Sequence, residues 1–446
     1  EKIDDLRHAA YNGRGLFLDS RDPSTLDESL RGALADIGDR TSAAAAVALN
    51  SGSLNINSGI FQARFDSADW SGQLLFLPVS NGSNTAGCTS EAQGQVCPER
   101  YDAGTVLNNQ NWNTQREIIT TQSDSRAGVP FRWNSISEDQ QNQIRNNPFG
   151  NNFNANTGQI VLNYLRGERR FEGGSGVRTR SSVLGDIVNS DPVFVSAPNQ
   201  TFDFSNYASF RAANSSRQPV VYVGANDGML HAFNASSGAE LFAYVPSAVY
   251  NNLSRLIFAN YNNNHRYFVD GAPVVGDVFI NSQWRSVLVS GLRGGGQGIF
   301  ALDVTNPVGI AESNAADAVM WEFTDADDRN LGFTFSQPVL RRMANGRWAT
   351  IVSSGYNNTD ADGNASTTGR GYIFVLYLTG PGGDGVWNLG TDYERIALPS
   401  ASGNTTTPAG IAGPSVISID DDIDAEIIYA GDLNGNMWRV DVASSD

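Results

Sequence analysis

The side chains best suited to binding a ligand lie in the segment VISIDDDIDAEIIYAGDLNGNMWRVD, residues 416–441. Oxygen-bearing side chains occupy every second position of its first half, at Ser418, Asp420, Asp422, Asp424 and Glu426. Ca²⁺ takes about six to eight oxygen ligands at about 2.3–2.6 Å from carboxylates, carbonyls and water. The spacing therefore predicts a calcium-binding loop between two strands. The alternative is a solvated acidic hairpin loop, which a chain of net charge −17 can easily carry.

A second candidate metal loop lies inside NNTDADGNASTTGRG, where Asp360, Asp362 and Asn364 form the pattern D-x-D-G-N. This pattern is the opening half of an EF-hand-like loop. No acid follows at the closing position, so a plain flexible loop is an equal alternative. The acidic run from Thr324 to Asp328 is interpreted as a turn rather than a site.

The two cysteines of the chain, Cys88 and Cys97, lie close together in a polar segment. This placement predicts one disulfide bond and an oxidising compartment. Closing a loop of about ten residues would stabilise the fold by roughly 2–3 kcal/mol in the chain-entropy estimate. Two unrelated exposed thiols are the alternative. Their spacing excludes a C-x-x-C redox or zinc motif, and the three histidines supply no cluster.

Composition limits the partners and the fold class. A net charge of −17 argues against nucleic acid and anionic membranes as partners, because both need basic patches. No stretch is long and apolar enough to span a bilayer. The chain begins at Glu1 without a signal peptide, so we expect a mature or trimmed piece. Forty-six glycines favour a turn-rich β protein.

The predicted secondary structure changes along the chain. Residues 1–50 are predicted to be a helical lead-in segment, because LDESLRGALADIGDR places leucines at helical spacing after a capping Ser or Thr. Short alternating apolar runs begin after residue 51. A polar Asn/Gln-rich insertion with a short helix and a loop is expected at about 134–165.

A repeat begins near residue 183. Each unit opens with a proline that precedes an apolar strand, at Pro192, Pro273, Pro338 and Pro414. A second strand ends in glycine (VVYVG, VLVSG, IVSSG, IIYAG), and a third strand follows each of these. Radially arranged antiparallel sheets repeat in this way. Residues 51–446 are therefore predicted to form an all-β, quinoprotein-like β-propeller.

Several runs resemble the propeller region of the PilY/PilC type IV pilus tip proteins: RSSVLGDIVNSDPVFV, VYVGANDGMLHAFNASSGAELFAYVPS, LVSGLRGGGQGIFALDVTNP, EFTDADDRNLGFTFSQPVL and YAGDLNGNMWRVDV. The resemblance continues upstream through EKIDDLRHAAYNGRG. It implies about seven modified blades and leaves open an incomplete ring at the C-terminus, because family members usually continue further. It also implies an extracellular place at the pilus tip of a Gram-negative bacterium. The implied partners are minor pilins and a surface or host-cell receptor. The implied roles are pilus biogenesis, the control of pilus extension and retraction, and adhesion.

The resemblance also implies Ca²⁺ as the bound ion, held by alternate positions of the 418–426 loop. The family's seventh loop position offers its backbone carbonyl, so the side chain of Asp424 is expected to be a spectator. The sequence departs from the family pattern at three positions: Ser418 replaces an acid, Glu426 replaces Asp, and Ile423 replaces a residue that is often glycine. Fewer charges and a stiffer bend predict a weaker affinity.

No catalytic role is expected. Pyrroloquinoline-quinone dehydrogenases share the propeller class, but their adjacent cysteine pair is absent, as is a G-x-S-x-G elbow. A quinoprotein-type dehydrogenase is therefore the weakest alternative. A glycan-binding, lectin-like adhesin is the other alternative, since exposed rings at Trp112, Trp133 and Trp387 would be able to stack on sugars. Packing of these tryptophans in the core is the favoured interpretation.

Overall fold

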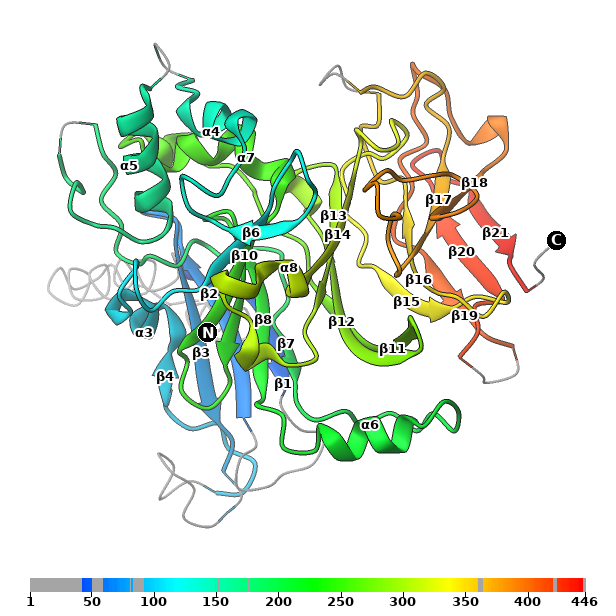
Figure 1. Ribbon diagram of the computed structural model, residues 1–446, viewed down its shortest axis with the longest axis horizontal. Coiled ribbons are helices and arrows are strands. Elements are labelled where there is room, and N and C mark those ends of the chain that lie inside the picture. Colours follow the sequence, from blue (N-terminus) through cyan, green and yellow to red (C-terminus); the bar gives the residue numbers. More distant parts are fainter. Residues whose placement is uncertain are drawn as a thin grey trace, which may run out of the picture.

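The computed structural model describes residues 42–49, 59–80, 82, 92–148, 150, 153–174, 176–359, 364–419 and 423–443. These residues form five β-sheets that follow one another along the chain (Figure 1). Four are antiparallel units of three or four strands, and the second is enlarged to six strands. This repetition confirms the predicted all-β architecture. Among the described residues no helix is both long and apolar enough to cross a membrane.

The strands of the first two sheets have the following bounds. The first contains β1 (Ser42–Leu49), β2 (Gly59–Asp66), β3 (Ser71–Pro78) and β4 (Tyr101–Asp102). The second has the order β6-β5-β10-β9-β8-β7 and contains β5 (Ile118–Thr121), β6 (Gly128–Pro130), β7 (Val193–Val195), β8 (Val220–Ala225), β9 (Met229–Asn234) and β10 (Glu240–Val245).

The other three sheets are simple antiparallel meanders. The third contains β11 (Val274–Ile280), β12 (Gln283–Gly291), β13 (Gly298–Asp303) and β14 (Val319–Thr324). The fourth contains β15 (Val339–Arg342), β16 (Trp348–Ser353), β17 (Tyr372–Tyr377) and β18 (Tyr393–Ala397). The fifth contains β19 (Ser415–Ile417), β20 (Ile427–Gly431) and β21 (Met437–Asp441), and it lies beside the C-terminal end in Figure 1.

Helices occupy the connections between strands. The α-helices of the described residues are α3 (Ala103–Asn109), α4 (Glu138–Arg145), α5 (Ala155–Leu165), α6 (Tyr207–Ala213), α7 (Tyr250–Leu253) and α8 (Ala315–Ala318). The 3₁₀ helices are η1 (Ser247–Val249), η2 (Ser254–Ile257), η3 (Tyr261–Asn263), η4 (Arg293–Gly295), η5 (Pro307–Gly309), η6 (Glu312–Asn314) and η7 (Ser400–Ser402).

The prolines of the repeat mark the inner strands of the sheets. β7, β11, β15 and β19 each begin at the residue after Pro192, Pro273, Pro338 or Pro414, as the sequence predicts. Neighbouring inner strands approach one another, since β7 lies beside both β1 and β11, and β11 lies beside β15. The inner strands β1, β7, β11 and β15 therefore lie side by side around a common centre, and the other strands of each sheet extend outward from them.

The second and third strands carry the core. β8, β16 and β17 are buried along their whole length, because each sheet is covered on both faces by its neighbours. Strands buried on both faces are expected to be continuous apolar runs rather than alternating ones. This burial explains why VVYVG and YIFVLY lack polar alternation. The buried side chains form four clusters, which include those between successive sheets.

Two parts of the predicted organisation differ in detail. Residues 1–41, which include the predicted helix LDESLRGALADIGDR, lie outside the described residues, but the end of the lead-in segment forms strand β1 and pairs with β2. The polar insertion contains two helices, α4 and α5. α4 begins at a capping box, in which Ser137 and Gln140 bond each other's backbone N–H. Both helices pack on the enlarged second sheet and on one another.

Candidate metal centre

The acidic segment connects two paired strands of the fifth sheet. β19 and β20 are antiparallel, with Ile417 opposite Ile427, so the intervening loop is the bend of a hairpin. The backbone N–H of Glu426 donates to the carbonyl of Ile417 at 3.1 Å. Ser418 and Glu426, the two ends of the predicted ligand series, therefore stand at the base of one loop. Asp420 and Asp422 lie outside the described residues.

The carboxylate of Glu426 turns back over the loop. Its Oε2 accepts a hydrogen bond from the backbone N–H of Ile419, on the opposite arm of the hairpin. A carboxylate that turns toward the loop backbone suits an oxygen-ligated cation, because such cations take carboxylate and backbone carbonyl oxygens together. The substitution of Glu for Asp at this position is therefore compatible with a ligand role.

Asp424 forms an ion pair with a residue of the neighbouring fourth sheet. Its carboxylate binds the guanidinium of Arg342 in β15 through two contacts, Nε to Oδ1 and Nη2 to Oδ2, the second at 2.8 Å. The backbone N–H of Ala425 also donates to the carbonyl of Arg342 at 2.7 Å. Bidentate Arg–carboxylate pairs fix geometry as well as charge. The side chain of Asp424 is thus engaged by Arg342, and its role as a spectator in calcium binding stays a prediction.

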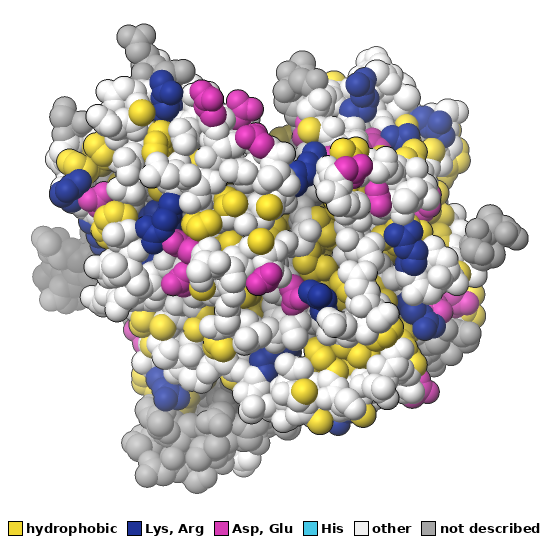
Figure 2. All heavy atoms as spheres, in the orientation of Figure 1, with side chains coloured by type: hydrophobic (Ala, Val, Ile, Leu, Met, Phe, Trp, Pro, Cys, Tyr) yellow, Lys and Arg dark blue, Asp and Glu magenta, His cyan; other side chains and the backbone are white. Residues whose placement is uncertain are grey.

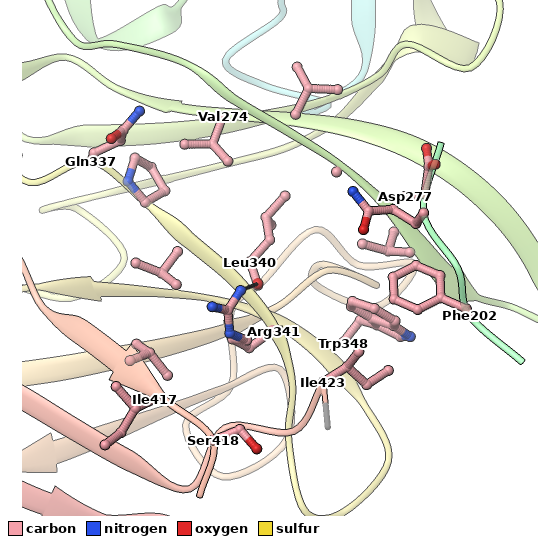
Figure 3. A pocket seen from close by; sticks show the side chains of 17 residues that line it. Phe202, Val274, Asp277, Gln337, Leu340, Arg341, Trp348, Ile417, Ser418 and Ile423 are labelled. Atoms are coloured by element: carbon pink, nitrogen blue, oxygen red, sulfur yellow. Dashed lines mark hydrogen bonds between the residues drawn. The ribbon is translucent and has the colours of Figure 1, made fainter. Parts of the chain in front are cut away.

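Ile423, which departs from the family pattern, has a packing role. Its half-buried side chain lies against the cluster formed by the third and fourth sheets. It also lines a groove of about 810 Å³ along the inner strands β11, β15 and β19. Figure 3 shows Ile423 beside Phe202 and Trp348 at one end of this groove, and Ser418 is also in its wall. An apolar residue at 423 therefore anchors the loop to the body of the protein.

Most of the described residues that line the groove are apolar, and the one acid among them already has partners. Asp277 accepts hydrogen bonds from the hydroxyls of Tyr207, at 2.6 Å, and Ser286. Among the described residues no group of three or more His, Cys, Asp or Glu side chains could hold a metal ion. Calcium binding by the 418–426 loop thus stays a prediction, with Ser418 and Glu426 brought together at its base and Asp424 directed to Arg342.

The second candidate loop connects β16 to β17. Asp360 and Asp362 lie outside the described residues, and Asn364 donates from Nδ2 to Asp325 Oδ2 at 3.2 Å. The acidic run 324–328 forms a turn, as expected, and its acids bind protein groups. Asp327 pairs with Arg126 at 2.7 Å, and Asp328 pairs with Arg395.

The remaining predicted residues have the following places. Cys97 is buried, and Cys88 lies outside the described residues, so the disulfide bond stays a prediction. Trp387 is buried, and its indole N–H donates to the carbonyl of Glu322 at 2.8 Å. Trp112 and Trp133 are half-buried, and Trp133 packs against the core. The core interpretation therefore holds for Trp133 and Trp387.

A buried charge cluster in the second sheet escaped prediction. Glu240, in β10, accepts hydrogen bonds from Arg116 at 2.6 and 2.8 Å and is bonded to His231 Nδ1 at 2.7 Å. The other ring nitrogen of His231 is 3.1 Å from Asp227. Burial alone would lower the pKa of His231, but Asp227 and Glu240 raise it to about 9. Burial would raise the pKa of Glu240, but Arg116 and His231 lower it to about 2.

The available sequence signal for this cluster was weak. His231 stands inside the apolar strand MLHAFN, with acids four residues before and nine residues after it. Arg116 is more than one hundred residues away in sequence. A polar residue within a buried strand indicates a partner, but the sequence does not reveal which distant residue supplies it. The cluster joins β9 and β10 to the segment before β5, and Asp227 at its edge lines a small cavity of about 10 Å³.

Comparison with known proteins places this architecture in a family. The family model described as the PilY1 beta-propeller domain matches residues 184–446. The chain belongs to the PilY1 β-propeller family. This confirms the resemblance given by the repeat motifs, and the matched residues include the hairpin with the acidic loop.

Two PilY1 proteins are similar in sequence to most of this chain. The type IV pilus biogenesis factor PilY1 of Pseudomonas aeruginosa strain PAO1 is 33% identical over 98% of this chain and 36% of its own length. A PilY1 homolog of Xylella fastidiosa is 40% identical over 62% of this chain and 21% of its own length. The crystal structure of the P. aeruginosa PilY1 C-terminal domain is 33% identical, with a TM-score of 0.43, over 56% of this chain and 45% of that one. The chain thus spans about a third of the length of the P. aeruginosa relative.

Proposed function

We propose that this chain is the propeller part of a type IV pilus biogenesis factor that acts outside the cell, at the pilus tip. The relatives that match 98% of the chain carry the name type IV pilus biogenesis factor PilY1, and this relationship is the observation that supports the proposal most strongly. Minor pilins are the proposed partners, together with a surface or host-cell receptor. The role is that of a non-catalytic scaffold in assembly, in extension and retraction control and in adhesion.

We further propose that the hairpin loop 418–426 binds Ca²⁺. The inward carboxylate of Glu426 and the engagement of Asp424 by Arg342 support a ligand set of Ser418, Asp420, Asp422, the carbonyl of Asp424 and Glu426. Bound calcium would neutralise the crowded acids and hold the two arms of the hairpin together. A ligand that binds only the folded state stabilises it by about 2.7 kcal/mol at 100 times its dissociation constant. Calcium occupancy would thereby regulate pilus extension and retraction.

Calorimetric titration of the metal-stripped chain with Ca²⁺ tests the calcium site. The wild type is expected to bind one ion at the loop, and the double variant Asp420→Ala/Asp422→Ala is expected to lose this binding. Asp360→Ala/Asp362→Ala is the matched control, since it removes two aspartates from the second candidate loop. A calcium response that survives in the first variant but disappears in the second would assign the ion to the other loop. No response in the wild type would contradict calcium binding altogether.

The pilus role needs a separate test in cells. Deletion of the gene segment that encodes this propeller from its native host is expected to reduce surface pili, and expression of the whole protein should restore them. The Asp420→Ala/Asp422→Ala protein is expected to restore assembly with altered retraction. Normal piliation in the deletion strain would contradict the biogenesis role.

A further inference from the structure

A second cavity, of about 630 Å³, lies away from the acidic loop. It is formed by connections of the second, third and fourth sheets together with α4 and α7. In Figure 2 the surface is hollowed between the lobe that carries α4 and the lobe that carries β17. Its volume is within the range of about 300–1,000 Å³ that is usual for ligand pockets. The lining residues that matter most are Gln143, Asn251, Tyr267, Gly294, Asp325 and Asn364.

Tyr267 is an exposed aromatic ring on a rigid support. On one side of it, His265 stacks on Trp70 with ring centres 3.7 Å apart and bonds Asp186 at 2.8 Å. On the other side, Phe268 is fully buried. Tyr267 is nevertheless 43% exposed. Two anchored neighbours therefore hold the Tyr267 backbone in place, so little conformational entropy is lost when a ligand contacts the ring.

The glycines of the loop Arg293–Gln297 let the backbone pack closely against this segment. A Cβ atom on Gly294 would lie 2.9 Å from Cδ2 of Tyr267. A Cβ atom on Gly295 would lie 1.6 Å from the carbonyl oxygen of Phe268. A Cβ atom at Gly295 would require the backbone to move, and one at Gly294 would require the ring of Tyr267 to move. The close approach makes one wall of the cavity a combination of aromatic ring and polypeptide backbone.

The other walls present amide groups. Gln143 comes from α4 and Asn251 from α7, and Asn364 bonds Asp325 at 3.2 Å across the boundary between the third and fourth sheets. A side-chain amide both donates and accepts hydrogen bonds, which matches a hydroxyl group. The lining contains one arginine, Arg266, and one acid, Asp325, while His265 is paired with Asp186. Among the described residues, the lining of the cavity therefore has one permanently charged side chain of each sign.

We propose that this cavity binds a short neutral oligosaccharide. A pyranose ring has one apolar C–H face, which stacks on Tyr267, and hydroxyl groups at its edge, which bond the amides and Asp325. An extended peptide would need a line of unpaired backbone groups to pair with, and the lining of the cavity consists of turns and helix ends. A polyanion would be repelled by a chain of net charge −17. The proposal is independent of calcium binding and of the pilus role.

Saturation-transfer NMR with the whole chain and three neutral disaccharides, lactose, N-acetyllactosamine and mannobiose, tests the proposal. At least one disaccharide is expected to receive saturation on its ring C–H protons. Tyr267→Ala is expected to weaken that binding at least tenfold, whereas Tyr267→Phe, which keeps the ring, should retain most of it. Phe171→Ala removes an aromatic ring of similar exposure from outside the cavity lining and should change nothing.

Asn251→Ala provides an independent variant, because this exposed side chain can be removed without disturbing the core. It is expected to weaken binding severalfold while the thermal unfolding midpoint stays unchanged. Failure of all three disaccharides to bind would overturn the proposal. Equal binding by the wild type and Tyr267→Ala would overturn it too, as would tighter binding of 3′-sialyllactose than of lactose, which would indicate an acidic ligand.

Discussion

Replacing Glu240 by glutamine tests whether the buried charge cluster holds the second sheet together. The side chain of Glu240 is fully buried and accepts hydrogen bonds from both Arg116 and His231. Glutamine keeps the volume, but it removes the negative charge and directs amide hydrogens at groups that are themselves donors. Removing one partner of a buried ion pair costs about 3–5 kcal/mol, because the other charge stays buried without compensation. The free energy of unfolding of Glu240→Gln is expected to fall by about that amount.

The pH dependence of stability adds a second readout. The pKa of His231 rises from 6.5 to about 9 on folding, so its contribution is complete below pH 6.5 and is lost as the pH rises through 9. The pKa of Glu240 falls from 4.5 to about 2, so its contribution is complete above pH 4.5 and is lost as the pH falls through 2. The cluster therefore stabilises the wild type most between pH 4.5 and 6.5. Loss of Glu240 should weaken the alkaline decline, because only Asp227 then supports the charge on His231.

Urea unfolding of the wild type and Glu240→Gln, followed by tryptophan fluorescence at pH 5.5, 7 and 9, measures both effects. Asp441→Asn is the control, because Asp441 forms an exposed pair with Arg439 at 3.3 Å. Such a pair contributes at most about 1 kcal/mol. A Glu240→Gln variant within about 1 kcal/mol of the wild type, with an unchanged pH profile, would refute the structural role assigned to the cluster.

Two further substitutions test other parts of the structure. Gly295→Ala is expected to lower the thermal unfolding midpoint, since its Cβ would overlap the carbonyl of Phe268; an unchanged midpoint would show that the loop can move away at no cost. Arg342→Ala removes the cation that binds Asp424, so calorimetry is expected to show tighter Ca²⁺ binding through reduced charge repulsion. Weaker binding would instead mean that Arg342 positions the calcium loop.

Local signals predicted the repeated strands well. The predicted run IIYAG coincides with β20, the run VLVSG ends with β12 at Gly291, and the inner strands begin directly after their prolines. These features depend on nearby residues: glycine where the chain must turn, and proline where no backbone donor is needed. The hairpin that carries the acidic loop was predictable for the same reason.

Contacts between distant segments were not predictable in this way. β5 joins β10 in parallel, with Ile118 opposite Ala243, and nothing in the run Glu117–Thr121 indicates that partner. The alanine-rich segment of β1 suits a helix or a strand equally, and pairing with β2 decides the outcome. Arg342 likewise reaches Asp424 only because the fourth and fifth sheets are neighbours.

The prolines that precede the inner strands have a consequence for the assembly of the sheets. Inner strands present unpaired edges toward one another around the axis, and such edges can join into mispaired sheets while the chain folds. Proline removes a backbone donor at the start of each of these edges, and β7, β15 and β19 are only three or four residues long. Short, proline-headed edges offer few consecutive hydrogen bonds to an incorrect neighbour. The prolines that mark the start of each repeat thus also disfavour incorrect pairing between one sheet and the next while the chain folds.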